Sequence, residues 1–335
     1  MPQHAIAVAT AIGGFLRSRG HWDRAAAQYQ IALRAARRAV DLPAQAGTLD
    51  ELGLLQQLTG DYPAATATLT QAAALYQDLG DRAGQAYALN HLGLVHLDTG
   101  DYSAAIARHQ QALAMAREAA DPLAEAVSLT DLALVQQLTG DFEPAAAGYH
   151  RALELFRRVG SEYDQADVLC ELGMLQRQMG DYPAALTSER QALDLFRRLG
   201  DRLGQAWALG ELGVVQRLTG DYVAAAASLG QALRLHRDLG APHGQAVALN
   251  SLGELSLATS ASEEARDLHG QALTIAREIG APPEEARALA GIGMSLLPHA
   301  PAEAAAHLRR ALAIYQRIGS PAVQPVQDAL HEHGL

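Results

Sequence analysis

A tripeptide of glycine, aspartate and an aromatic residue returns every 40 residues in this chain and limits how it can fold. It stands at Gly60-Asp61-Tyr62, Gly100-Asp101-Tyr102, Gly140-Asp141-Phe142, Gly180-Asp181-Tyr182 and Gly220-Asp221-Tyr222. A Leu-Gly pair keeps the same step, as at Leu52-Gly53 and Leu92-Gly93. A chain that repeats at this period folds as a stack of similar units, because one unit cannot cover its own apolar face.

Each period predicts two helices. Residues 182–199 carry apolar side chains at helical spacing, with Asp181 as an N-cap and Gly200 as a stop, and residues 202–218 follow after Asp201. The helix that holds the Leu-Gly pair is called helix A, and the helix after the Gly-Asp-aromatic tripeptide is called helix B. Abundant Ala and Leu with only 5% aromatic residues favour an all-α fold.

The register extends to both ends of the chain. We therefore expect residues 1–335 to form one solenoid, with the apolar segment 5–16 inside the first repeat rather than a leader, and residues 320–335 as a capping helix. The expected repeats are 5–40, 45–80, 85–120, 125–160, 165–200, 205–240, 245–280 and 285–319.

The spacing of the Leu-Gly pair, the tripeptide and the two alanines that follow it resembles the tetratricopeptide repeat. The period exceeds the commoner one of about 34 residues. With the segments RALELFRRVG and GQAWALGELGVVQRLTG, it is similar to kinesin light chain arrays and to actinobacterial AfsR-type regulators. The resemblance implies a right-handed superhelical solenoid of antiparallel helix pairs, about eight repeats long. It also implies a concave face, lined by the A helices, that binds a protein or peptide.

Small residues and two histidines are expected to serve packing. Where Gly53 and its equivalents face Ala65 and its equivalents, the two helices must approach closely. His109 and His269 share one register position that holds Leu69 or Leu229 in other repeats, so we expect both rings to pack rather than to bind a metal.

An apolar stripe is the first candidate for the binding face. It lies two residues after each leucine of the Leu-Gly pair, and its members are Leu54, Leu94, Leu134, Met174, Val214, Glu254 and Met294. Six of the seven are apolar, which suits an amphipathic helix or an extended hydrophobic peptide. The competing interpretation is that these side chains pack on the next helix A and belong to the core.

A second register position on helix A holds small, mixed residues, and specificity is expected there. Its members are Asp50, Asn90, Thr130, Cys170, Gly210, Asn250 and Ala290. Asn90 and Asn250 could clamp a partner's backbone, since an amide both donates and accepts, or they are solvated surface. Cys170 is expected to fill space rather than to act as a nucleophile.

Charge is divided between the two helices of each repeat. The helix A halves contain 17 Asp and Glu against 5 Arg, whereas the helix B halves contain 18 against 19. Asp50, Asp131, Glu171 and Glu254 therefore predict a concave face that prefers a basic or amphipathic partner. Ordinary solvation of these carboxylates is the alternative.

Two arginines occupy equivalent positions on this acidic side. Arg177 and Arg217 could grip a carboxylate or phosphate, but pairing with Glu171 and Glu211 of their own helices competes. The chain has no lysine. The lysine-dependent carboxylate clamp of the family therefore cannot be carried over.

Composition excludes several function classes. Without lysine there is no Walker, Schiff-base or kinase-type lysine, and no catalytic or metal-binding constellation is apparent. We expect no enzyme, no cofactor and no metal. A net charge of −11 argues against direct nucleic-acid binding. The single cysteine favours the cytoplasm, and no apolar run is long enough to cross a membrane.

Three functions fit this pattern, and the sequence leaves the oligomeric state and the partner's identity open. The first is a free-standing scaffold that binds a protein or peptide. The second is the sensor part of a larger bacterial transcriptional regulator or signalling ATPase, and the third is a receptor for a small molecule or signalling peptide.

Overall fold

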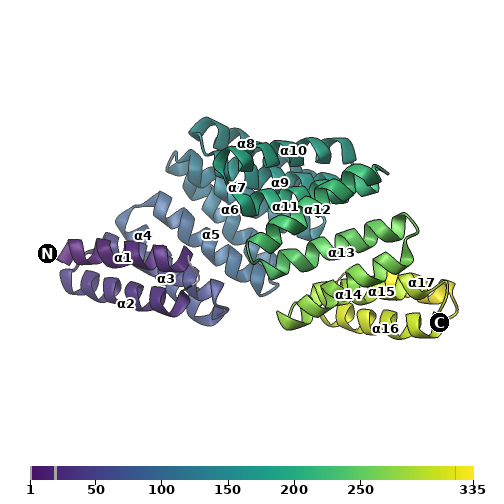
Figure 1. The fold of residues 1–335 in the computed structure, drawn as a ribbon. Helices are drawn as coiled ribbons and strands as arrows, with labels where there is room; N and C mark the ends of the chain where they lie inside the picture. The colour runs from purple at the N-terminus through teal and green to yellow at the C-terminus, as the bar shows by residue number, and fades with distance from the viewer. Residues whose placement is uncertain (1, 19–20, 321) are drawn as a thin grey trace. The chain divides into compact units, whose positions relative to one another are not determined.

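Helices A and B alternate along the whole of the computed structural model, which describes residues 2–18, 21–320 and 322–335 (Figure 1). The A helices are α1 (Pro2–Ser18), α3 (Leu42–Leu58), α5 (Arg82–Asp98), α7 (Pro122–Thr139), α9 (Glu162–Gln178), α11 (Arg202–Leu218), α13 (Pro242–Ala258) and α15 (Pro282–Leu296). The B helices are α2 (Trp22–Ala39), α4 (Tyr62–Leu79), α6 (Tyr102–Glu118), α8 (Phe142–Val159), α10 (Tyr182–Leu199), α12 (Tyr222–Asp238), α14 (Ser262–Glu278) and α16 (Pro301–Arg317). A last helix, α17 (Val323–Glu332), follows them. The described residues contain no strand, which confirms the all-α prediction.

Local signals set the helix ends. Asp181 Oδ1 accepts a hydrogen bond from the backbone N–H of Ala184, and Gly200 ends α10 with φ of 70°. Asp201 caps α11 in the same way, through the N–H groups of Leu203 and Gly204. The helices predicted over residues 182–199 and 202–218 are therefore confirmed.

The chain divides into two compact units, residues 1–171 and 172–335. In the first unit, Leu49, Leu52 and Leu55 of α3 pack with Tyr29 and Leu33 of α2. In the second, Leu252 and Leu255 of α13 pack with Leu229 of α12. Helices α3 and α13 thus each bury one face against the helix B before them. The expected single-solenoid organisation over residues 1–335 stays a prediction.

The helix A glycines admit a large side chain from helix B. A Cβ on Gly213 would lie 3.3 Å from the backbone oxygen of Ala225, so the predicted close approach of glycine and alanine is confirmed there. The same Cβ would lie only 2.6 Å from Leu229 Cγ, a contact the sequence analysis missed. At Gly93 the invading group is the ring of His109, which is fully buried. The packing role predicted for His109 is confirmed, as it is for His269 against Gly253.

The C-terminal segment forms the predicted terminal helix. Val326 and Leu330 of α17 are buried in a cluster with Leu296, Leu308 and Tyr315, so α17 covers the end of the α15–α16 pair (Figure 1). Residues 19–20 of the expected first repeat and residue 321 of the expected cap lie outside the described residues. Within the described ranges, no helix is both long and apolar enough to cross a membrane.

Candidate binding site

The predicted stripe is partly exposed in both units. Leu54, Leu94 and Leu134 in the first unit and Met174, Val214 and Glu254 in the second are half-buried, and Met294 is exposed. All seven therefore retain solvent-accessible surface, which the purely core interpretation did not anticipate. Their role in binding a partner stays a prediction.

A pair of ionisable side chains joins α3 and α5 in the first unit. His91 Nδ1 lies 2.9 Å from Asp50 Oδ1. Burial lowers the pKa of His91, but the hydrogen bond and charge of Asp50, with the charges of Asp131 and Glu51, outweigh burial and raise the pKa above its usual value. His91 is thus the counter-charge of an otherwise acidic helix A surface, and the sequence analysis did not single it out.

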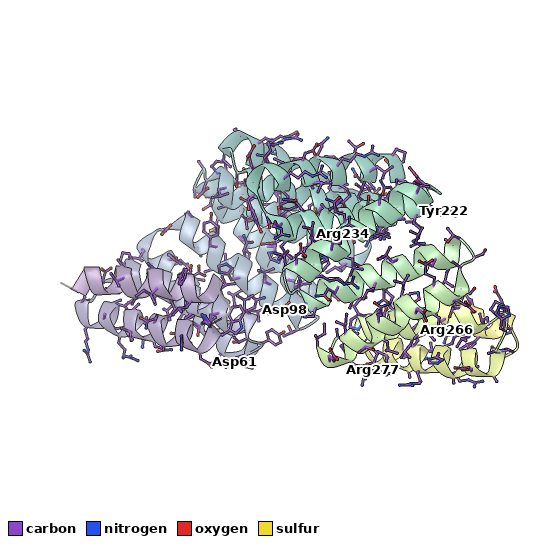
Figure 2. All side chains as sticks on the ribbon, in the orientation of Figure 1. Asp61, Asp98, Tyr222, Arg234, Arg266 and Arg277 are labelled. Carbon is purple, nitrogen blue, oxygen red and sulfur yellow. The ribbon has the colours of Figure 1, made fainter. Side chains whose placement is uncertain are left out.

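Asp131 on α7 is the most perturbed carboxylate of this surface. Burial raises its pKa to about 7, and the nearby positive charge of His91 opposes that shift only in part. Near neutral pH this carboxyl group therefore populates both its protonated and its ionised form. Near the end of the neighbouring α5, Asp98 (labelled in Figure 2) accepts a hydrogen bond from Gln57 Nε2 of α3 at 2.7 Å. Successive A helices are linked by polar side chains along this face.

Asn90 is buried, contrary to its expected role as a clamp for a partner's backbone. Its Nδ2 donates to Ser128 Oγ at 2.9 Å, and its Oδ1 lies 3.2 Å from His109 Nδ1. Both ends of the amide are already bonded inside the helix stack. Two other predicted residues of this unit are half-buried, namely Thr130, which donates to Ala126 O in its own helix, and Glu171.

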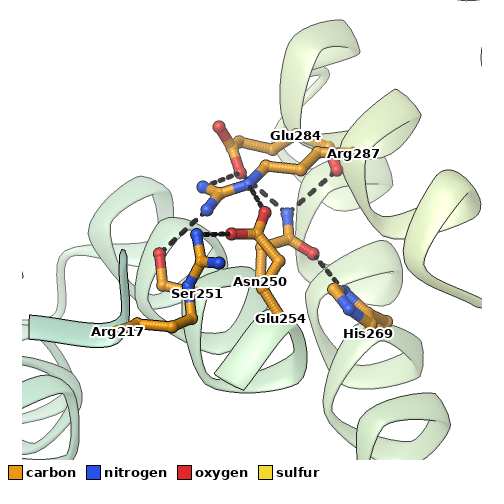
Figure 3. A network of polar contacts seen from close by, with 7 residues as sticks. All are labelled: Arg217, Asn250, Ser251, Glu254, His269, Glu284 and Arg287. Carbon is orange, nitrogen blue, oxygen red and sulfur yellow. Dashed lines mark hydrogen bonds and ion pairs between the residues drawn. The ribbon is translucent and has the colours of Figure 1, made fainter. Parts of the chain in front are cut away.

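In the second unit, Glu254 on α13 lies between two arginines (Figure 3). Arg217 Nη2 of α11 lies 2.9 Å from Glu254 Oε2, and Arg287 Nε of α15 lies 2.6 Å from Oε1. Burial raises the pKa of Glu254, but the charges of Arg287 and Arg217 outweigh it and hold the pKa below its usual value. Arg287 also donates to Ser251 Oγ at 3.0 Å. Three successive A helices are thus joined by one ionised carboxylate.

Asn250 belongs to the same network and is likewise buried. Its Nδ2 donates to the backbone oxygen of Glu284 at 3.2 Å and to Oε2 at 2.8 Å, and its Oδ1 lies 3.0 Å from His269 Nδ1 (Figure 3). Burial lowers the pKa of His269 to about 4. The ring is therefore neutral at pH 7, and its Nδ1–H donates to Asn250. As with Asn90, the expected clamp role is wrong, because the amide is used internally.

A cavity of about 340 Å³ opens beside this network. Its wall contains five predicted residues, Arg177, Gly210, Val214, Arg217 and Glu254. Arg177 Nη2 lies 3.3 Å from Glu211 Oε2 of the next helix A, so Arg177 and Arg217 each pair across helices. The sequence predicted pairing only with carboxylates of the same helix, so these ion pairs between helices were not predicted. The structure thus brings these five candidates together.

The cavity also contains side chains that the sequence analysis missed. Trp207 is partly exposed there, 4.9 Å from His236 between ring centroids, and Arg287 of α15 also lines the cavity. Trp207 and Arg287 share one register position, which holds Gly47, Tyr87, Val127, Asp167 and Val247 in other repeats. The residue type at this register position therefore changes from repeat to repeat, and this variation was the signal in the sequence that could have identified Trp207 and Arg287.

Two family models, both described as tetratricopeptide repeat, match the chain. One covers residues 48–83, and the other matches at 84–158, 124–198 and 164–238. The chain belongs to the tetratricopeptide repeat family. No curated protein matches the sequence.

Solved structures share this tetratricopeptide fold. BtubC (BKLC) from P. vanneervenii is 23% identical with a TM-score of 0.59, over 66% of this chain and 92% of that chain. A Rap protein complexed with competence and sporulation factor is 16% identical with a TM-score of 0.64, over 98% and 99%. A signal transduction ATPase (STAND) with a tetratricopeptide repeat sensor, from Pyrococcus horikoshii, is 16% identical with a TM-score of 0.71, over 92% of this chain and 46% of that one.

Proposed function

We propose that this tetratricopeptide protein is a non-catalytic scaffold that binds a peptide or protein segment on its helix A surface. The observation that carries the proposal is the cavity in the second unit, where Trp207 and Val214 stand beside Arg177, Arg217 and Glu254. A ligand pocket combines apolar wall with a few placed polar groups, and this cavity has both. We infer that an apolar side chain of the partner contacts Trp207 and Val214, while its polar groups meet the ion pairs.

The chemistry of the first unit favours a basic group on the partner. Asp50 and Glu51 lie on α3 and Asp131 lies on α7, and His91 of the intervening helix A, α5, is their nearby counter-charge. In the second unit, by contrast, Glu211 and Glu254 face arginines. An amphipathic partner with a basic segment would complement the first surface electrostatically.

The structural neighbours support a binding or regulatory role. One Rap neighbour was solved with competence and sporulation factor, and it matches nearly the full length of both chains. The STAND neighbour carries its tetratricopeptide array as a sensor, and this chain spans less than half of that protein. The second candidate function is therefore the sensor portion of a signalling ATPase or a transcriptional regulator. We further propose a cytoplasmic location, since Cys170 is the only cysteine.

Selection from a random peptide library displayed on phage tests the scaffold. We expect enriched peptides that combine apolar and basic residues. Their affinity should fall at least about tenfold with Val214→Glu, because the new carboxylate lies in the apolar wall. Val223→Glu is the matched control, since Val223 is 85% exposed on α12, outside the cavity. Circular dichroism checks that each variant keeps its helices.

Two results would count against the proposal. If no peptide is enriched, or if both valine variants weaken binding equally, the cavity is not the binding site. If the enriched peptides lack basic residues and their binding ignores both salt and the double change Asp131→Arg with Glu171→Arg, the electrostatic part is wrong while the site survives.

A further inference from the structure

A second cavity, the α4–α6 cavity, lies in the first unit and is lined by residues of α4, α5 and α6 (Figure 1). Its volume is about 440 Å³, which is within the range of small-molecule sites. Leu89 and Leu92 of α5, which are buried, and Met115 of α6, which is half-buried, give it an apolar wall. It shares no residue with the cavity beside Glu254, so it is a separate site.

One leucine of the repeat is missing from the wall of the α4–α6 cavity. Ala73 of α4 lines the cavity, and its register position holds leucine in the other seven repeats. These leucines are Leu33, Leu113, Leu153, Leu193, Leu233, Leu273 and, with the shift of the last repeat by one residue, Leu312. A side chain of leucine size would therefore fill space that this repeat leaves open.

The corresponding groove of the second unit has a different wall. Its volume is about 370 Å³, Leu193 occupies the position of Ala73, and Asp194 in the wall lies 3.6 Å from Arg197. In the α4–α6 cavity, the position of Asp194 is held by Ala74. None of the described residues that line the α4–α6 cavity is acidic, although the chain carries 37 acidic residues.

Two amides and one arginine of the wall offer hydrogen-bond donors. Arg108 Nη1 of α6 donates to Gln111 Oε1 at 2.9 Å, and Arg82 Nη1 donates to Gln85 Oε1 at 2.9 Å. Because both amide oxygens already accept, their Nε2 groups remain as donors. Glu118 lies 3.4 Å from Arg82, whereas Arg108 has no carboxylate partner among the described residues. The wall therefore favours an anionic group.

We propose that the α4–α6 cavity binds a small monocarboxylate with an apolar chain. The chain lies against Leu89 and Leu92, in the space that leucine fills in other repeats. The carboxylate accepts hydrogen bonds from Arg108 and from the amide of Gln85 or Gln111, and no carboxylate of the wall repels it. This site is independent of the helix A surface proposed for the peptide partner.

Octanoate tests the apolar part of the proposal. Isothermal titration of the full chain at pH 7 should show saturable binding, and Ala73→Leu should abolish it without lowering the thermal midpoint, because the new side chain fills the cavity. Ala67→Leu, at an exposed position of α4 outside the wall, should bind octanoate like the wild type. Absence of saturable binding to the wild type, or unchanged binding by Ala73→Leu, would overturn the proposal.

The carboxylate part has its own variants and probes. Arg108→Gln should weaken octanoate binding at least about tenfold, because it removes a charge-assisted hydrogen bond. Arg234→Gln removes the same charge on α12, outside the cavity (Figure 2), and should leave the affinity unchanged. The wild type should bind octanol and octylamine at least about tenfold more weakly than octanoate. Equal losses from the two arginine variants, or octanol that binds as tightly as octanoate, would refute the proposed ligand class.

Discussion

Two glycines three residues apart on α11 have opposite surroundings. A Cβ on Gly213 would lie 2.6 Å from Leu229 Cγ and 3.3 Å from the backbone oxygen of Ala225, neither of which is the free end of a flexible chain. A Cβ on Gly210 would meet nothing within 4 Å. The same residue type therefore fills two roles in one helix, close packing at Gly213 and no evident steric need at Gly210.

These surroundings predict opposite effects of the same substitution. Gly213→Ala should lower the free energy of unfolding by about 1 to 3 kcal/mol, because the methyl overpacks the α11–α12 contact. Gly210→Ala should raise it by up to about 1 kcal/mol, because alanine is the better helix former. Urea denaturation followed by circular dichroism measures both. Equal effects of the two changes would mean that helix propensity, not packing, governs these positions.

The raised pKa of Asp131 predicts a pH-dependent stability. An Asp in the unfolded chain has a pKa near 3.9, whereas burial raises that of folded Asp131 to about 7. Between these values the unfolded state loses its proton first, so the penalty from Asp131 grows as pH rises from about 4 to about 7 and is constant above. Asp131→Asn should remove this penalty and stabilise the protein at pH 8.

Asp131→Asn should raise the free energy of unfolding by about 1 to 2 kcal/mol at pH 8. This gain is smaller than the full pKa shift implies, because solvent screens this half-buried group. The gain should shrink toward pH 5 in thermal or urea denaturation. Asp267→Asn, at an exposed position on α14, should show no such trend. A gain from Asp131→Asn that is independent of pH would argue against the raised pKa.

At the scale of the elements, the helices follow from local chemistry and were predictable. Asp181 and Gly200 act on the backbone beside them, so a sequence pattern alone locates the ends of α10. The same determinants recur in most repeats. This is why the all-α fold and the boundaries over residues 182–199 and 202–218 were predicted correctly.

The ion pairs of the candidate site depend on contacts between helices, and the sequence did not predict them. Arg217 and Glu254 are 37 residues apart, and their distance depends on how α11 packs on α13. Pairs within one helix follow from its period, so the sequence pattern indicated only those. The burial of Asn90 and Asn250 had a detectable signal, since each asparagine stands 19 residues before a histidine of the same register position.

At the scale of the whole molecule, contacts join near neighbours in the stack. In the second unit, Leu229 of α12 packs with Leu255 of α13. Leu308 of α16 packs with Val326 and Leu330 of α17 in a separate cluster. In such an array stability is close to a sum over repeats and their interfaces, so damage at one end spreads only to the adjoining repeats. Helix α17 is the element where this can be tested, because it is the last helix of the described residues and covers the α15–α16 pair.

Leu330→Asp should therefore loosen one end of the protein and leave the other intact. A carboxylate would replace a buried leucine that packs with Leu296 and Leu308, and α17 should detach, at a cost of several kcal/mol to the last repeat. Hydrogen exchange should become faster in residues 282–317 and stay unchanged in residues 42–159. Gln327→Asp adds the same charge on the exposed side of α17 and should change neither region. Faster exchange along the entire chain would show instead that the two units unfold as one cooperative body, because the loss of one terminal interface would then be transmitted to every repeat.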